Sequence, residues 1–435
     1  MMQVELIGLL GLLVMFALMF LRLPIAIAMA IPAFIGIVYL KEWETLKTAV
    51  ETIVWDHSFS YTLSTIPMFV LMGELLYVCG ISTELFGTFR AWLSRMRGGL
   101  GMATVGSSAL FAAASGSSLA NTATMGIIAS KEMLHYGYNK SFVGGTIVAG
   151  GTLGPLIPPS TLFIIYGMMT EQSIGQLLIA GLVPGLILMV LFMITIYIAA
   201  LIKSDLAPII KEKVSWKERI ISLKTTGWIL VLFGIVIGGM YMGYFNPTEA
   251  AGIGAFATLI IALIRKKLTF QKFVGAMSST LKTTGFLFAI IIMAFLLNYF
   301  FTITKLPLFL ANSLNGLSLP PAALFAIIVI MYIILGAIMD ALAMVVITIP
   351  IILPLIHGMG MDLIWFGVII VLLIELAMIT PPVGMNCFVL KGAAPELSLE
   401  EIFKGALLFT VPILVLIVIL YLFPDIAIYL PSKMY

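Results

Sequence analysis

The sequence predicts an all-α polytopic membrane protein made of two inverted repeats, each with a re-entrant helical hairpin and a discontinuous transmembrane helix. Three observations lead to this fold class. Hydrophobic residues make up 62% of the 435 residues and charged residues only 10%, whereas soluble domains are about 45–50% apolar and about 25% charged. Two apolar segments are interrupted by polar residues, glycine and proline. Both interruptions recur later in the chain.

The first interruption is SGSSLANTAT, residues 115–124, which stands between apolar runs. Such a polar segment is tolerated at membrane depth only where it is buried in protein or lines a polar cavity. A tight contact between helices is the alternative, because small residues are common there. The hydroxyl and amide residues of the segment are Ser115, Ser117, Ser118, Asn121, Thr122 and Thr124.

The second interruption is GGTLGPLIPPS, residues 150–160, with three glycines and three prolines. A continuous helix does not cross such a segment, because proline lacks the amide hydrogen and glycine weakens the helix. The sequence therefore predicts a broken helix here, with a simple proline kink as the alternative.

Both features return at a constant spacing. The pair Pro158 and Pro159 recurs as Pro381 and Pro382, and 381 − 158 = 223. The same offset takes Ser117 to Asp340, inside the interrupted run LGAIMDALAMVV. A duplicated hairpin and broken helix is typical of transporters that bind their cargo near the bilayer midplane.

The remaining apolar runs predict ordinary spans, and two amphipathic stretches, 41–59 and 268–284, are expected to lie along the membrane interface. The first repeat is expected over residues 1–202, a cytoplasmic linker over 203–225 and the second repeat over 226–435. The predicted spans are 6–21, 23–40, 66–79, 174–202, 226–245, 249–264, 285–302 and 402–422, the broken helices are 141–170 and 363–391, and the second hairpin is 321–356.

The basic residues predict the orientation. If Arg22 is cytoplasmic and each hairpin re-enters on its own side, the residues that lie outside are only Lys41, Lys47, Lys305 and Lys433. This leaves 23 − 4 = 19 basic residues in cytoplasmic loops. Such an excess fixes the orientation by the positive-inside rule. We therefore expect both termini in the periplasm and the two hairpins on opposite faces of the membrane.

Several classes of function are excluded. The net charge of +3 comes from loops and forms no basic patch, so no nucleic-acid partner is expected. Cys79 and Cys387 lie in separate apolar segments, where packing is their expected role. An intramembrane serine protease needs a nucleophile with a partner histidine in an adjacent span, and the sequence offers none. We predict that the protein is not an enzyme.

The polar groups of the two interruptions suit the binding of a monovalent cation and of an anion. Hydroxyl, amide and carbonyl oxygens are hard neutral ligands that suit Na⁺, while the starts of helices favour anionic groups. Asp340 is a functional candidate, because an acid at the bilayer centre costs about 2.5–3.5 kcal/mol. For Glu74 and Glu375, structural and functional roles stay equally open.

The segments GSSLANTATMGIIASKEM, GGTLGPLIPPS, GAIMDALAMVVITIPIILPLI and ITPPVGMNCFVLKG resemble the large membrane subunit of tripartite ATP-independent periplasmic (TRAP) transporters, the DctM-like family. The resemblance extends over essentially the whole chain. It implies an elevator-type fold and Na⁺-driven uptake of an organic acid anion across the bacterial inner membrane. It also implies two protein partners besides membrane lipid, a separate small membrane subunit of the Q type and a periplasmic substrate-binding protein.

The resemblance also implies roles for individual residues, with two or more Na⁺ sites. The first Na⁺ site would comprise Ser115, Ser117, Asn121, Gly154 and Pro158. The second would comprise Gly336, Asp340, Thr380, Pro381 and Gly384. The substrate would contact Ser118, Thr122, Asp340 and Asn386.

Two alternatives remain open at this point. A stand-alone Na⁺/dicarboxylate carrier of related architecture would work without a binding protein, and a non-transporting membrane scaffold would not carry any substrate. The motifs fit sialic acid, dicarboxylates and other acids equally well.

Overall fold

The computed structural model describes residues 4–210, 214–315, 319–336 and 338–434, and this part of the chain is helical without β-strands. Short 3₁₀ turns occupy Thr62–Ser64 and Ser204–Leu206. The α-helices are α1 Val4–Phe20, α2 Ile25–Leu40, α3 Trp43–Ser58, α4 Thr65–Val78, α5 Ile81–Leu93, α6 Gly99–Ser115, α7 Ser118–His135, α8 Lys140–Gly151, α9 Thr161–Thr170, α10 Ile174–Ile202, α11 Trp216–Tyr241, α12 Pro247–Ile264, α13 Phe270–Ile303, α14 Leu306–Asn315, α15 Pro321–Leu335, α16 Ala341–Gly358, α17 Leu363–Ile379, α18 Met385–Ala393, α19 Leu399–Leu422 and α20 Asp425–Ser432.

Six of the described helices are long and apolar enough to cross a membrane, or seven if α3 and α4, which meet at a 55° bend, count as one span. Most other apolar helices are shorter because the chain interrupts them. This agrees with the prediction of a polytopic helical membrane protein.

The predicted interruptions fall in breaks between helices. The first hairpin is α6 and α7, which are separated by Gly116 and Ser117, and the second is α15 and α16. The first broken helix is α8 and α9, and the second is α17 and α18. The helix starts follow the 223-residue offset, since α7 and α16 begin at 118 and 341, and α8 and α17 at 140 and 363. Residue 337, in the second hairpin, lies outside the described residues.

Local chemistry explains the hairpin breaks. Gly116 has φ +59°, a left-handed conformation that suits glycine and ends α6. Ser117 then caps α7, because its Oγ accepts a hydrogen bond from the Ala120 amide at 3.4 Å. Asp340 caps α16 in the same way, with Oδ1 accepting from the Ala343 amide at 2.8 Å. Both side chains satisfy amides that a helix start leaves unpaired.

Some helix bounds differ from the predicted ones. Helix α11 begins at Trp216, inside the stretch 203–225 predicted as a linker, after a capping box in which Ser215 and Glu218 bond each other's backbone amides. Residues 211–213, with Lys211 and Lys213 of the charge count, lie outside the described residues. The amphipathic stretch 268–284 and the span 285–302 form one helix, α13, since no proline interrupts them. The helix α5 was not predicted as an element of its own.

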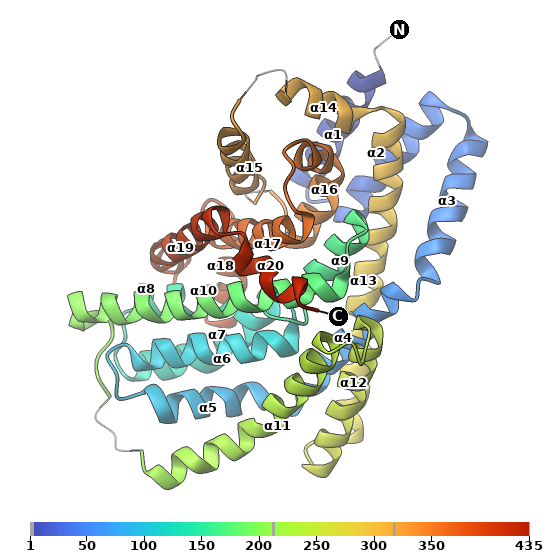
Figure 1. The fold of residues 1–435 in the computed structure, drawn as a ribbon. Helices are drawn as coiled ribbons and strands as arrows, with labels where there is room; N and C mark the ends of the chain where they lie inside the picture. The colour runs from blue at the N-terminus through green and yellow to red at the C-terminus, as the bar shows by residue number, and fades with distance from the viewer. Residues whose placement is uncertain (1–3, 211–213, 316–318, 337, 435) are drawn as a thin grey trace.

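The two halves of the chain are interwoven. Helix α8 packs on α19, and α17 packs on α10. In the α8–α19 contact, a Cβ at Gly145 or Gly405 would collide with the backbone of the other helix, so these glycines allow the close approach. Figure 1 shows α10 crossing the middle of the molecule near α8, α17 and α19.

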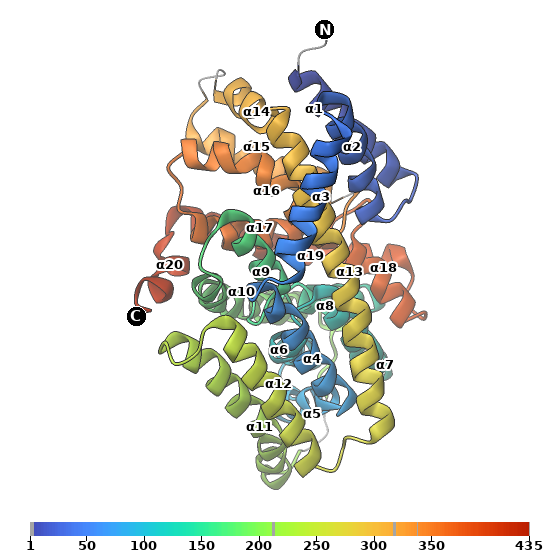
Figure 2. The same cartoon turned by 90° about the vertical axis from the view of Figure 1, so that its right-hand side faces the viewer.

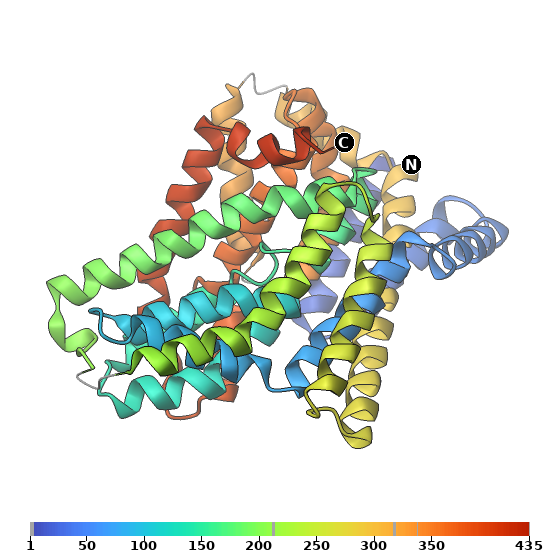
Figure 3. The same cartoon turned by 60° about the horizontal axis from the view of Figure 1, so that its bottom comes forward.

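The outer helices occupy the two ends of the molecule. Figure 2 shows α1 and α2 at one end and α11 and α12 at the other, with α13 extending between them. Helix α13 packs on α2 and α4, and α12 packs on α4. Helix α3 lies on the outside, against α2 and α13 (Figure 3).

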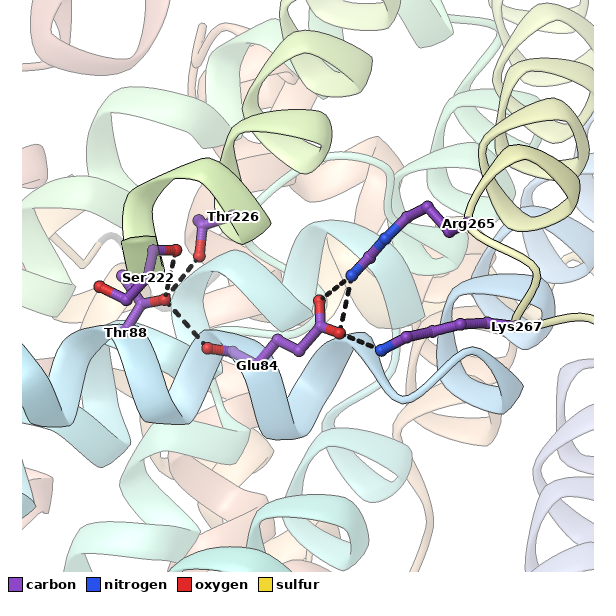
Figure 4. A network of polar contacts seen from close by, with 6 residues as sticks. All are labelled: Glu84, Thr88, Ser222, Thr226, Arg265 and Lys267. Atoms are coloured by element: carbon purple, nitrogen blue, oxygen red, sulfur yellow. Dashed lines mark hydrogen bonds and ion pairs between the residues drawn. The ribbon is translucent and has the colours of Figure 1, made fainter. Parts of the chain in front are cut away.

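A polar network ties α5 to the second half of the chain (Figure 4). Glu84 on α5 forms ion pairs with Arg265, at 2.8 Å, and with Lys267, just beyond α12. One turn later, Thr88 Oγ1 lies 2.7 Å from Thr226 Oγ1 and donates to the Ser222 carbonyl at 3.0 Å. Ser222 and Thr226 belong to α11. The network therefore fixes α5, the helix that leads into the first hairpin, to α11 and α12.

We expect Glu84→Gln to lower the thermal unfolding midpoint of the purified protein in detergent. The change leaves Arg265 and Lys267 without their acidic partner. The cost should lie between the ~1 kcal/mol of exposed pairs and the ~3–5 kcal/mol of buried ones. Glu51→Gln is the matched control, because Glu51 is exposed on α3. Equal midpoints for the two variants would contradict a stabilising role of the network.

Candidate functional site

The tip of the first hairpin lies against the break of the first broken helix. A Cβ at Gly154 would come within 2.7 Å of the Ser117 backbone, and one at Gly116 would come within 2.7 Å of the Pro159 carbonyl oxygen. Thr161 Oγ1 donates to the Gly116 carbonyl at 3.4 Å. The structure therefore brings together the segments that carry Ser115, Ser117, Gly154 and Pro158, as the first predicted Na⁺ site requires.

Asn121 holds the helices around this junction. Its Nδ2 donates to the Ser108 carbonyl at 3.0 Å and to the Gly150 carbonyl at 3.2 Å. The amide thus ties α7 to α6 and α8, while Oδ1 is buried without a hydrogen-bond partner. Asn121 has a structural role that the sequence did not indicate, and its Oδ1 remains free for a cation.

The second junction is arranged differently. A Cβ at Gly336 would collide with Ala377 of α17, and Thr380 Oγ1 donates to the Ala377 carbonyl at 3.2 Å. Gly384, with φ +50°, begins α18. Residues 151–160 of the first break are all buried, whereas Pro381 and Pro382 of the second are exposed. The hairpin tip here packs on the end of α17 rather than covering the prolines.

Two of the residues predicted to contact substrate meet at one acid. Ser118 and Asn386 both face the Glu375 carboxylate, Ser118 from the start of α7 and Asn386 from the start of α18. Thr122 lies one turn after Ser118 and is fully buried. Asp340 caps α16, with one carboxylate oxygen bonded to its own helix.

The structure gives different surroundings to Glu74 and Glu375, the two acids whose roles the sequence left open. Glu74 accepts a hydrogen bond from Ser279 Oγ at 2.8 Å and so joins α4 to α13. Glu375 is 1% exposed, and neither of its oxygens has a hydrogen-bond partner. Its position next to the ITPP motif was a signal in the sequence, but its neighbours come from distant segments.

The donor set at the first junction fits Na⁺. The buried side chains that end there carry neutral oxygens, and Asn121 Oδ1 and Thr122 Oγ1 lack partners. Buried polar atoms are nearly always bonded in native proteins, so unpartnered ones indicate water or an ion. Within the described residues, no group of three or more His, Cys, Asp or Glu side chains could hold a metal ion, which leaves no divalent-metal cluster there.

Comparison with known proteins gives consistent similarities. The family model described as "Tripartite ATP-independent periplasmic transporter, DctM component" matches residues 12–426. The C4-dicarboxylate TRAP transporter large permease protein DctM of Pseudomonas aeruginosa is 36% identical over 380 residues, which cover 87% of this chain and 88% of that protein. The sialic acid TRAP transporter large permease protein SiaM of Vibrio cholerae is 29% identical over 374 residues, covering 86% and 87%.

Two further similarities extend the comparison. The isethionate TRAP transporter permease protein DctMQ of Oleidesulfovibrio alaskensis is 33% identical over 358 residues, which cover 80% of this chain and 54% of that protein. Among solved structures, the YdaH transporter of Alcanivorax borkumensis superposes with a TM-score of 0.64 over 90% of this chain and 89% of that chain, at 14% identity. That likeness concerns the fold alone.

We expect Gly154→Ala to destabilise the protein, because the added methyl group would push the helix break away from the hairpin tip. Overpacking of this kind typically costs about 1–3 kcal/mol. Gly252→Ala is the control, since a Cβ there meets nothing within 4 Å and alanine favours the helix by about 1 kcal/mol. Unfolding of both variants in detergent checks this, and a Gly154→Ala protein as stable as the control would show that the junction is loose.

Proposed function

Because this chain belongs to the DctM component family of tripartite ATP-independent periplasmic transporters, we propose that it takes up an organic acid anion by Na⁺-coupled secondary transport. The carrying observation is the meeting of the first hairpin tip with the first helix break, where Gly154 faces the Ser117 backbone. Neutral oxygens of the hairpin tip and the break rich in glycine and proline converge there, and such a site suits a dehydrated Na⁺.

We infer that the two repeats are related by inverted topology. Helix contacts support this, because they occur in pairs with the partners exchanged. Helix α4 packs on α12 as α13 packs on α2, and α7 packs on α18 as α16 packs on α9. Each pair follows the 223-residue offset, as a two-fold relation between the repeats requires.

We propose an elevator motion for this arrangement. The hairpins and broken helices would move as one body, while α1, α2, α11 and α12 would form the scaffold. The buried first break and the exposed Pro381 and Pro382 of the second are compatible with a site that faces one side at a time. Such a motion presents a midplane site alternately to the two sides.

Two partners complete the proposed transporter. The name of the DctMQ relative joins two components in one permease, and we propose that this chain works with a corresponding small membrane subunit. A periplasmic binding protein would deliver the substrate. Relatives named for C4-dicarboxylate, isethionate and sialic acid share an acidic cargo, so the proposal extends to the class of organic acid anions.

The basic residues predict which side each loop faces, with both termini in the periplasm. Cys79 and Cys387 are buried, so single added cysteines can be labelled in whole cells over a low background. We expect Lys41→Cys to react with a membrane-impermeant reagent and Lys217→Cys to react only after the membrane is opened, since both positions are exposed. Periplasmic labelling at position 217 would rule out the orientation and the inverted repeats.

We further expect electrogenic uptake. Two Na⁺ carried with one monovalent acid move one net positive charge, to which the membrane potential contributes about 2.3 kcal/mol per 100 mV. Reconstituted with its two partners, the protein should accumulate a monovalent acid faster under a negative-inside potential, and only with Na⁺ outside. Omitting the binding protein tests for the stand-alone carrier. Equal uptake without Na⁺, or under a proton gradient alone, would contradict the ion assignment.

A further inference from the structure

Glu375 is a buried acid whose neighbouring side chains are neutral. It lies in α17, about one turn before the helix ends at Ile379. Both carboxylate oxygens lack a hydrogen-bond partner, and the side chain is 1% exposed. An unpaired buried carboxylate is strongly unfavourable, so the group needs a compensating ligand. Glu74, the comparable acid of α4, has such a compensation in Ser279.

The groups around Glu375 are polar and neutral. Ser118 and Asn386 face the carboxylate from the first turns of α7 and α18, which pack against each other. Both amide atoms of Asn386 are buried and unpartnered. Three helices thus direct polar atoms into one region.

No cationic side chain balances the carboxylate. Within the part of the chain that the structure describes, the groups that act on Glu375 are Ser118 and Asn386, and no Lys, Arg or His is among them. The first turns of α7 and α18 carry partial positive charge, which favours an ionised carboxylate. These helix ends do not replace a full counter-charge in a buried site.

The geometry favours a metal cation over a proton. A protonated Glu375 could donate directly to Asn386 or Ser118, and Asn386 Nδ2 could donate to its other oxygen. Such bonds would satisfy all three residues. Asn386 and Ser118 lie within reach of the Glu375 carboxylate, but no atom of the Glu375 carboxylate or the Asn386 amide makes a well-aligned hydrogen bond. Oxygens that converge without bonding one another are arranged as they are around an ion.

We propose that Glu375, Ser118 and Asn386 bind Na⁺ at the contact of α7, α17 and α18. This site rests on the proposed Na⁺ coupling and adds to the two sites predicted at the hairpin tips. It differs from them in holding a carboxylate and in joining the first hairpin to the second broken helix. Ser118 and Asn386 then serve the cation, and the substrate lies elsewhere.

The test uses the purified full-length chain in nanodiscs, where transport is not needed. The thermal unfolding midpoint is measured against NaCl concentration, with KCl keeping the ionic strength constant. We expect Glu375→Gln, which keeps the side-chain volume, to raise the Na⁺ concentration for half-maximal stabilisation at least about tenfold, or about 1.4 kcal/mol. Glu74→Gln is the matched control, with a lower midpoint but an unchanged Na⁺ response.

Each outcome is decisive. A wild-type protein that responds to Na⁺, with Glu375→Gln responding equally, overturns this site and leaves the proposed function standing. A wild-type protein without any Na⁺ response overturns both. If Glu375→Gln instead loses the pH dependence of stability while keeping its Na⁺ response, the ligand is a proton and the proposal fails. Should Glu375→Gln not fold, Ser118→Ala decides, because it should weaken the Na⁺ response severalfold, and an unchanged response overturns the site.

Discussion

The membrane interior offers no water to an unpaired backbone group, so every break in a helix must be covered by protein. The first broken helix meets this constraint by placing residues 151–160 entirely inside the fold. Gly116 of the first hairpin and Gly181 of α10 come so close to this break that any side chain there would strike the Pro159 or Leu156 carbonyl oxygen. The hairpin, the break and α10 therefore depend on one another, and the proposed cation site is a result of this cover.

The two junctions between a hairpin tip and a broken helix are built from matching motifs, but their prolines differ in exposure. The prolines of the first break are buried and those of the second are exposed. The difference comes from the hairpin tips, because Gly116 meets the proline pair itself whereas Gly336 meets Ala377 before its proline pair. The proposed alternating exposure of the site would need such an asymmetry in each of its two end states.

The breaks could be predicted because their causes are local. Proline, glycine and capping side chains such as Ser117 and Asp340 act within a few residues. The start of α11 also has a local cause, the capping box of Ser215 and Glu218. The first turns of this helix are polar, however, and their composition resembles that of a linker. The different surroundings of Glu74 and Glu375 could not be predicted, because Ser279 and Ser118 reach them from over 200 residues away. Two acids in similar apolar runs are distinguished only by tertiary packing.

The continuous helix α13 has a mechanical consequence. Its 34 residues, at about 1.5 Å each, give a rod about 51 Å long, whereas the hydrocarbon core is about 30 Å thick. The rod must tilt or extend beyond the core, and its tilt changes with the thickness of the bilayer. Helix α13 packs on α2 and α4, and α4 packs on α12. A change in membrane thickness that tilts α13 therefore alters the angle between the two ends of the molecule. The lipid composition therefore acts on the outer helices that surround the hairpins and broken helices.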